Sequence, residues 1–149
     1  LRSERAFSIN LMLTHRDGEA IDFECTPEEV FWLMPEQDLL VHANHFVSLP
    51  ARIKVKDRGL PGNADSLYRD MRVRRHLMRH HGSITVDTLK EALADRFGAP
   101  RAVCRSPTTG PGGKVSSTVA TVIMDTTAGR MWIAPRPYGT HRYTEYSLA

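Results

Sequence analysis

The chain has 149 residues, of which 41% are hydrophobic and 25% charged, a composition typical of one globular domain or of a large part of a bigger fold. The chain contains no run of about 18 apolar residues, the length needed to cross a bilayer. Its first residues include Arg2, Glu4 and Arg5 and no apolar stretch, so they do not resemble a secretion signal. We therefore expect a cytoplasmic protein without a membrane partner. The net charge of +3 is too small an excess to define a partner by itself.

The two cysteines, Cys25 and Cys104, lie too far apart in the sequence for a paired metal motif. In a reducing compartment they would remain thiols. We expect both to be buried or half-buried, and we predict neither a metal nor a cofactor.

The first half of the chain predicts a hairpin followed by short elements. Apolar and polar residues alternate over residues 7–13 and 20–25, and Asp17-Gly18 between them is a hairpin signal. Thr26-Pro27 predicts a helix of one or two turns that ends before Pro35. Residues 39–43 predict a short apolar strand, and residues 47–64 predict a long surface connection.

The second half predicts helices and then strands. Asp65 begins one helix, which ends at Gly82, and Thr85 begins another that continues to Phe97. A loop over residues 106–113 leads to strands at 117–125, 130–134 and 143–148. The first of these strands is apolar on both faces, which predicts that both are covered. The order of elements indicates an α+β fold in which helices pack on a sheet.

The apolar run of residues 39–43 ends at Asn44-His45-Phe46, and this ending suggests a function. A side-chain amide held at the end of a strand can donate a hydrogen bond where an oxyanion develops, which is a large term in acyl-transfer catalysis. Asn44 is therefore the candidate oxyanion donor. The amino terminus, Leu1-Arg2-Ser3, does not supply a terminal nucleophile, so we expect one to come from elsewhere.

From about Ala6 onward, the order of landmarks resembles the carboxy-terminal part of the acyl-coenzyme A:6-aminopenicillanic acid acyltransferases, a cysteine group of the N-terminal-nucleophile (Ntn) hydrolases. The matching landmarks are Asp22-Phe23-Glu24, His42-Ala43-Asn44-His45-Phe46, Ser66 with Arg69 and Arg72, Gly82-Ser83-Ile84-Thr85, Asp95, Val103-Cys104-Arg105, Ser117-Thr118-Val119-Ala120 with Met124-Asp125, and Tyr143-Thr144-Glu145-Tyr146-Ser147-Leu148.

This resemblance implies that residues 1–149 are the carboxy-terminal portion of an αββα sandwich whose nucleophile-bearing segment is absent. In the family, a precursor cuts itself and exposes a cysteine whose own α-amino group acts as base. Asn44 would then bind the oxyanion, and His45, Phe46 and Arg105 would bind substrate or support the site. The implied partners are the upstream segment or subunit, a small-molecule acyl donor and an amine, with acyl-coenzyme A as a candidate substrate.

The sequence departs from the family at two positions. Arg136 stands where we expect a glycine, and Arg96 stands where a histidine is common. The internal Cys25 and Cys104 lack a free amine, so we expect the chain alone to be inactive. Whether the reaction is transfer or hydrolysis stays open.

Other interpretations also stay open. Asn44 could form hydrogen bonds that stabilise a turn and have no role in a site. Arg105 could be a structural ion-pair partner. The segment of residues 65–82 is rich in arginine and histidine, so a non-enzymatic basic module that binds nucleic acid or a protein partner is the alternative. Aromatic residues rarely interrupt this basic segment, which argues against nucleic acid.

Overall fold

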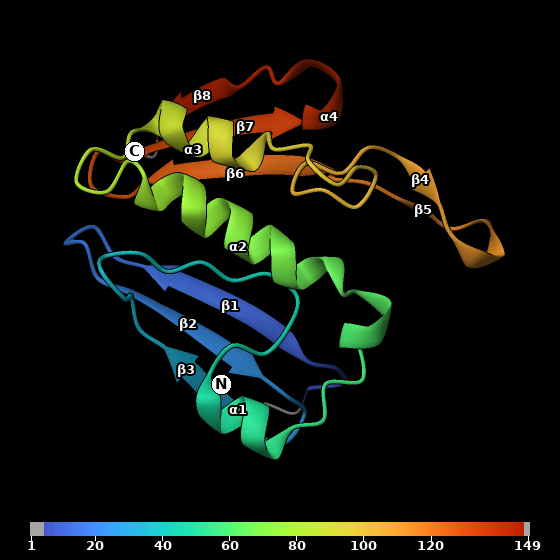
Figure 1. Ribbon diagram of the computed structural model, residues 1–149. Helices are drawn as coiled ribbons and strands as arrows, with labels where there is room; N and C mark the ends of the chain where they lie inside the picture. Colours follow the sequence, from blue (N-terminus) through green and yellow to red (C-terminus); the bar gives the residue numbers. More distant parts are fainter. Residues whose placement is uncertain (1–4, 148–149) are drawn as a thin grey trace. The chain divides into compact units, whose positions relative to one another are not determined.

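The computed structural model describes residues 5–147, except for the side chain of Pro111. The chain divides into two compact units, Leu1–Asp70 and Met71–Ala149. The described residues form a mixed α+β structure with three small antiparallel sheets and four helices (Figure 1). None of these helices is long and apolar enough to cross a membrane.

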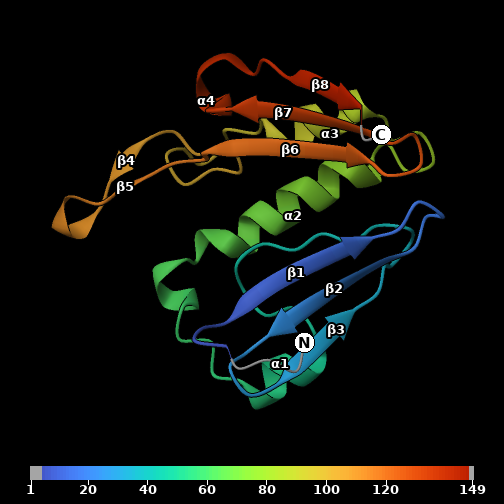
Figure 2. The ribbon, with the colours of Figure 1, turned by 180° about the vertical axis from the view of Figure 1, so that it is seen from behind.

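The first unit contains a sheet of three antiparallel strands in the order β1-β2-β3. The predicted hairpin is confirmed: β1 (Ile9–Thr14) pairs with β2 (Ala20–Cys25), with Leu11 opposite Phe23. Gly18 adopts a φ of +89° in the connecting turn, a conformation that glycine accepts without steric cost. Helix α1 (Leu49–Lys54) lies next to this sheet (Figures 1 and 2).

The predicted helix after Thr26 is wrong, because residues 30–33 form the third strand, β3 (Val30–Leu33). The Thr26 hydroxyl does accept the backbone N–H groups of Glu28 and Glu29, as a cap would. This turn instead directs the chain back along β2, where Val30 pairs with Cys25. Ladder hydrogen bonds with β2 outweigh the local helix signal.

The predicted strand at residues 39–43 is also wrong. Only Leu39 forms a bridge, with Glu36, across a tight turn in which Gln37 and Asp38 adopt positive φ angles. Residues 40–43 form no ladder, although Leu39 and Val41 are buried. The apolar pattern of residues 39–43 therefore reflects burial of Leu39 and Val41 and not a β-strand.

The predicted connection of residues 47–64 contains two short helices that the sequence analysis did not anticipate. Ser48 caps α1, with its side chain accepting the backbone N–H of Ala51, and a 3-10 turn, η1 (Leu60–Gly62), follows. Pro50 lies in the first turn of α1, where the N–H that proline lacks would have no partner within the helix.

Helix α2 (Asp65–Met78) begins at the predicted Asp65 and crosses the boundary between the units. In the second unit, α3 (Val86–Leu93) has the predicted Thr85 cap, a full capping box with Thr88. This helix stops before Phe97, because the Asp95 carboxylate accepts the Phe97 backbone N–H at 2.9 Å in a competing local turn.

The sheet of the second unit has the order β6-β7-β8, formed by β6 (Ala120–Asp125), β7 (Arg130–Pro135) and β8 (Thr144–Ser147). All three strands were predicted, although Leu148 lies outside the described residues. Helix α3 packs on one face of this sheet (Figures 1 and 2). The prediction that β6 is covered on both faces is wrong: Ile123 is buried, whereas Val122 and Met124 are 47% and 57% exposed.

The predicted loop of residues 106–113 forms part of a projecting arm. Strand β4 (Thr108–Thr109) pairs with β5 (Val115–Ser116), and a 3-10 turn, η2 (Pro111–Gly113), joins them. The arm extends away from the β6-β7-β8 sheet in both views (Figures 1 and 2).

Arg136, where the resemblance leads us to expect a glycine, adopts a left-handed conformation with φ of 47° and ψ of 57°. It precedes the short helix α4 (Pro137–Thr140), and its backbone N–H donates to the Val119 carbonyl at 2.7 Å. Residues with a Cβ rarely adopt this conformation, whereas glycine does so readily.

We therefore predict that Arg136→Gly stabilises the protein. Relief of the left-handed strain exceeds the added entropy of the unfolded chain, so the free energy of unfolding should rise by about 0.5 kcal/mol. Urea denaturation measures the change. Arg142→Gly, at an exposed position without a positive φ, should lower the same free energy. Destabilisation by both substitutions would contradict the prediction.

Candidate functional site

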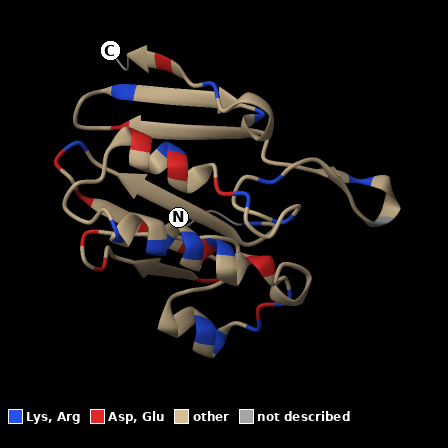
Figure 3. Ribbon diagram, turned by 45° about the horizontal axis from the view of Figure 1, so that its top comes forward, with Lys and Arg blue, Asp and Glu red and all other residues tan. Residues whose placement is uncertain are grey.

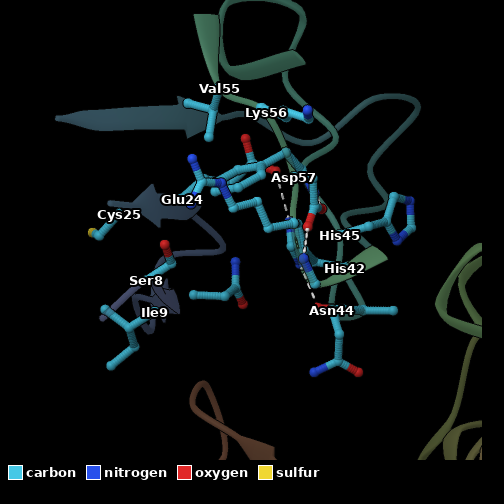
Figure 4. A pocket seen from close by; sticks show the side chains of 15 residues that line it. Ser8, Ile9, Glu24, Cys25, His42, Asn44, His45, Val55, Lys56 and Asp57 are labelled. Carbon is cyan, nitrogen blue, oxygen red and sulfur yellow. Dashed lines mark hydrogen bonds and ion pairs between the residues drawn. The ribbon is translucent and has the colours of Figure 1, made fainter. Parts of the chain in front are cut away.

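The first unit contains a pocket of about 460 Å³, built by four segments. The start of β1, the end of β2, residues 42–46 and residues 55–59 form its lining (Figure 4). Three of the four predicted site residues, Asn44, His45 and Phe46, line this pocket together. The structure thus places these three consecutive residues at one pocket.

The fourth predicted residue, Arg105, belongs to the second unit. Its backbone N–H donates to Thr118 Oγ1 at 2.8 Å, and its Nη1 donates to Ser116 Oγ at 3.3 Å. Both contacts position the segment that precedes β6. The predicted role of Arg105 in the site stays a prediction.

A buried carboxylate at the end of β2 organises the pocket wall. The Glu24 side chain is 1% exposed. Its Oε1 accepts from His42 Nε2 at 2.8 Å and from the Val47 backbone N–H. Its Oε2 accepts from the backbone N–H of Ser48 at 3.1 Å and from the Ser48 hydroxyl. One side chain thus ties both ends of residues 42–48 to the sheet.

His42 completes this buried charge cluster. Its Nδ1 donates to the Ala43 carbonyl at 2.8 Å while Nε2 faces Glu24, so both ring nitrogens act as donors, as in an imidazolium. Asp22, fully buried, lies 3.8 Å from the same Nε2 and accepts from Asn10 Nδ2 at 2.8 and 2.7 Å. A cationic His42 therefore lies between two acidic groups.

The pKa shifts agree with this assignment. Burial opposes the charge of Glu24, yet its hydrogen bonds from His42, Ser48 and Val47 outweigh burial and lower the pKa of the carboxyl group. Burial also opposes the charge of His42, but hydrogen bonds to Glu24 and Ala43 and the field of Asp22 raise its pKa. The pair is thus held in its ionised form.

Ser66, on α2, positions the candidate residues Asn44 and His45. Its fully buried hydroxyl accepts the Asn44 backbone N–H at 2.6 Å and lies 2.8 Å from His45 Nδ1. Since the oxygen already accepts from Asn44, its own hydrogen can be donated to His45, which fits a neutral ring. Burial lowers the pKa of His45, which favours that neutral state.

Arg69 fixes the orientation of the Asn44 side chain. Its Nη2 donates to Asn44 Oδ1 at 2.7 Å, while its Nε donates to Asp65 Oδ2 at 2.8 Å. With Oδ1 occupied, the amide nitrogen of Asn44 is left to donate, and no other group in residues 5–147 accepts from it. The Asn44 side chain is exposed and extends away from Glu24 and Cys25 (Figure 4). The amide nitrogen of Asn44 is therefore available to donate a hydrogen bond to a ligand or to water.

Both cysteines are free and buried, as predicted. Cys25 borders the pocket but is 0% exposed, so its thiol is not presented as a nucleophile. Burial raises the pKa of Cys104, which disfavours its thiolate. Within residues 5–147, no group of three His, Cys, Asp or Glu side chains is arranged to hold a metal ion.

The arginines of α2 are partly engaged by acids. Arg69 pairs with Asp65, and Arg72 pairs with Asp95 and stacks over the Phe97 ring at 4.2 Å. On α2 and α3, Lys and Arg residues are interspersed with Asp and Glu, whereas every charged residue of α1 is basic (Figure 3). These pairings argue against a continuous basic surface for nucleic acid.

Sequence reasoning noted Asp22, Glu24, His42, Ser66 and Arg69 only as landmarks and missed their roles. One signal was available. Asp22 and Glu24 alternate on one face of a strand, and a strand that buries two carboxylates must supply partners for them.

No protein-family model matches the chain. No curated protein matches it either.

We predict that His42 stabilises the fold in a pH-dependent manner. Because its pKa is raised in the folded state, its contribution is complete below its ordinary value of 6.5 and is lost as the pH rises through the folded value. Glu24, with its lowered pKa, contributes above its ordinary value of 4.5 and loses its contribution in acid. The pair should therefore stabilise most between these two values.

His42→Gln should lower the free energy of unfolding by about 3 kcal/mol near pH 6, the usual cost of breaking a buried ion pair. The difference from the unchanged protein should shrink as the pH rises toward 9. Urea denaturation across this range measures it, with His15→Gln in the exposed hairpin turn as the control. A difference independent of pH would show that His42 is not cationic in the folded protein.

Proposed function

We propose that the chain is the carboxy-terminal part of a cysteine-dependent Ntn acyltransferase or amidohydrolase, similar to the acyl-coenzyme A:6-aminopenicillanic acid acyltransferases. Its substrates would be an amide or thioester of a small acid, and water or an amine would accept the acyl group. Its two three-stranded sheets, β1-β2-β3 and β6-β7-β8, would belong to an αββα sandwich completed by the nucleophile-bearing segment.

The observation that carries this proposal is the Asn44 amide. Arg69 holds its oxygen at 2.7 Å, and Ser66 holds its backbone N–H at 2.6 Å, so both ends of the residue are fixed. The amide N–H groups are thereby available to a ligand at the edge of a pocket. Preorganised donors cost no reorganisation when charge develops, which is how an oxyanion hole accelerates acyl transfer.

The proposed reaction needs a thiol whose base is its own α-amino group. The thiolate attacks the substrate carbonyl, and Asn44 stabilises the negative oxygen of the tetrahedral intermediate by about 3 kcal/mol. The amine or thiol then leaves with the proton held by the α-amino group, and the acyl group remains on sulfur. Water or a second amine attacks this thioester and releases the cysteine.

Two further features support the proposal. The buried Cys25 and Cys104 are internal, so the nucleophile would come from the upstream segment that the resemblance implies. Arg136 lies in a left-handed conformation that suits the glycine expected from the family pattern. This agreement concerns the backbone and does not depend on the identity of the substrate.

The test uses the protein produced with the segment encoded before Leu1. Intact mass should reveal a polypeptide that begins with cysteine, and the protein should hydrolyse an N-acyl amide. Asn44→Ala should lower kcat about 100-fold. It should change the free energy of unfolding by less than about 0.5 kcal/mol, because the side chain is exposed.

Asn63→Ala is the matched control, since Asn63 is also exposed in the first unit but does not line the pocket. It should leave kcat unchanged. If Asn44→Ala and Asn63→Ala lower activity equally, or if no cysteine-initiated polypeptide exists, the proposal fails.

A further inference from the structure

The outward side of α1 is apolar. Ala51 lies on the buried side of this helix and is 0% exposed. Leu49 and Ile53 each lie two positions from Ala51, so in a helix of 3.6 residues per turn they project together on the opposite side. They are 66% and 75% exposed. A helix at a protein surface normally presents polar residues to water, so α1 has the reverse pattern.

Basic residues surround this apolar pair. Four of them, all exposed, are Arg52, Lys54, Lys56 and Arg58. Asp57 is the only acid from residue 49 to residue 58, so four positive charges against one negative give this segment +3, which equals the net charge of the whole chain. We refer to residues 49–58 as the α1 patch.

Neighbouring acids neutralise little of the charge of the α1 patch. Lys54 pairs with Glu29 at 2.8 Å, but both side chains are exposed, and such surface ion pairs are weak. The Asp57 carboxylate accepts the backbone N–H groups of Gly59 and Leu60, each at 3.0 Å, and so stabilises the turn that follows. The patch therefore keeps an excess of positive charge beside its apolar pair.

Exposed cations occur elsewhere in the chain, and their combination with an outward apolar pair distinguishes the α1 patch. On α2, Leu67 and Met71 are also four residues apart, and they are 48% and 55% exposed. Arg69 and Arg72 beside them are engaged by acids of the chain. The apolar pair of α2 thus lacks the concentrated positive charge that accompanies the pair of α1.

An anionic lipid surface matches both properties of the α1 patch. Aliphatic side chains enter the boundary between the head groups and the acyl chains, while lysine and arginine are attracted to the anionic head groups. A nucleic acid would satisfy only the cations, because base stacking requires aromatic side chains and the patch contains none. The two exposed aliphatic residues therefore favour a membrane surface.

We propose that the α1 patch docks the protein on the surface of anionic membranes, with Leu49 and Ile53 inserted among the lipid head groups. The contact is peripheral and reversible, so it requires no membrane-spanning helix. It goes beyond the proposed function and does not depend on it. It revises the sequence-based expectation of no membrane partner, which considered only segments long enough to span a bilayer.

The expected strength follows from the charges. Each lysine or arginine near an anionic surface strengthens binding about fivefold, so three of them contribute about 100-fold. Added salt screens this attraction. Two partly inserted aliphatic side chains should contribute at least about tenfold.

Co-sedimentation with vesicles measures binding of the full chain. One set of vesicles contains phosphatidylcholine alone, and the other contains about 30% phosphatidylglycerol. The protein should bind the anionic vesicles at least about 100-fold more tightly than the neutral ones. Sodium chloride at about 0.5 M should release most of the bound protein.

The charge of the α1 patch is tested by R52Q/K56Q/R58Q, which should weaken binding to the anionic vesicles about 100-fold. The matched control R74Q/R75Q/R79Q removes the same number of positive charges from α2 and its C-terminal turn and should retain binding. This pair of variants separates the local patch from the total charge of the chain.

The apolar pair is tested by L49Q/I53Q, which should weaken binding at least about tenfold. Its matched control, L67Q/M71Q, makes the same change on α2 and should retain binding. Urea denaturation of each variant verifies that it is folded.

A polarity-sensitive fluorophore tests insertion directly. Attached to Ile53→Cys, it should emit at a shorter wavelength with anionic vesicles, whereas attached to the exposed Asn63→Cys it should not. The native Cys25 and Cys104 are buried, so the label reaches the introduced cysteine.

Equal binding to neutral and anionic vesicles, or absence of binding to both, would overturn the proposal. Equal losses in the α1 variants and their α2 controls would also overturn it. A third contrary result is binding of double-stranded DNA as strong as lipid binding and unaffected by L49Q/I53Q, because it would identify the patch as a general site for polyanions.

Discussion

The carboxylate of Glu24 is the constraint on which the pocket depends. It is buried at the end of β2 and receives the His42 ring, the Ser48 hydroxyl and the backbone N–H groups of Val47 and Ser48. Because residues 42–48 form no strand ladder, these hydrogen bonds replace the ladder that would otherwise hold them. A charged group can take this role in a protein interior only when several donors and an opposite charge compensate its lost hydration.

A second set of contacts transfers this order to Asn44. Ser66 holds the Asn44 backbone and faces His45, while Arg69 holds the Asn44 oxygen and is itself oriented by Asp65. Asp65, Ser66 and Arg69 all lie at the start of α2, so Ser66 and Arg69 contact the same segment of the pocket wall. The amide therefore has a defined direction although its side chain is exposed, a combination that suits a group meant to meet a ligand.

Charge is distributed unevenly in the first unit. The acids around the pocket are buried or used by backbone N–H groups, whereas the basic residues of the α1 patch are exposed. Buried charges maintain shape, because breaking their pairs is costly. Exposed charges are cheap to maintain and remain available for recognition.

Local signals in the sequence determined several elements because their causes are local. Asp17-Gly18 set the hairpin turn and Thr85 the start of α3, and the adjacency of Asn44, His45 and Phe46 followed from their order. Only the tertiary structure decided that residues 30–33 form a strand, since that outcome depends on pairing with β2. It likewise decided the contacts of Glu24 with His42 and of Ser66 with His45, which join residues 18 and 21 positions apart. The hydrogen bonds of turns and caps join residues a few positions apart, so the local sequence determines them. The partner of a buried charge can come from any part of the sequence that the fold brings close to it.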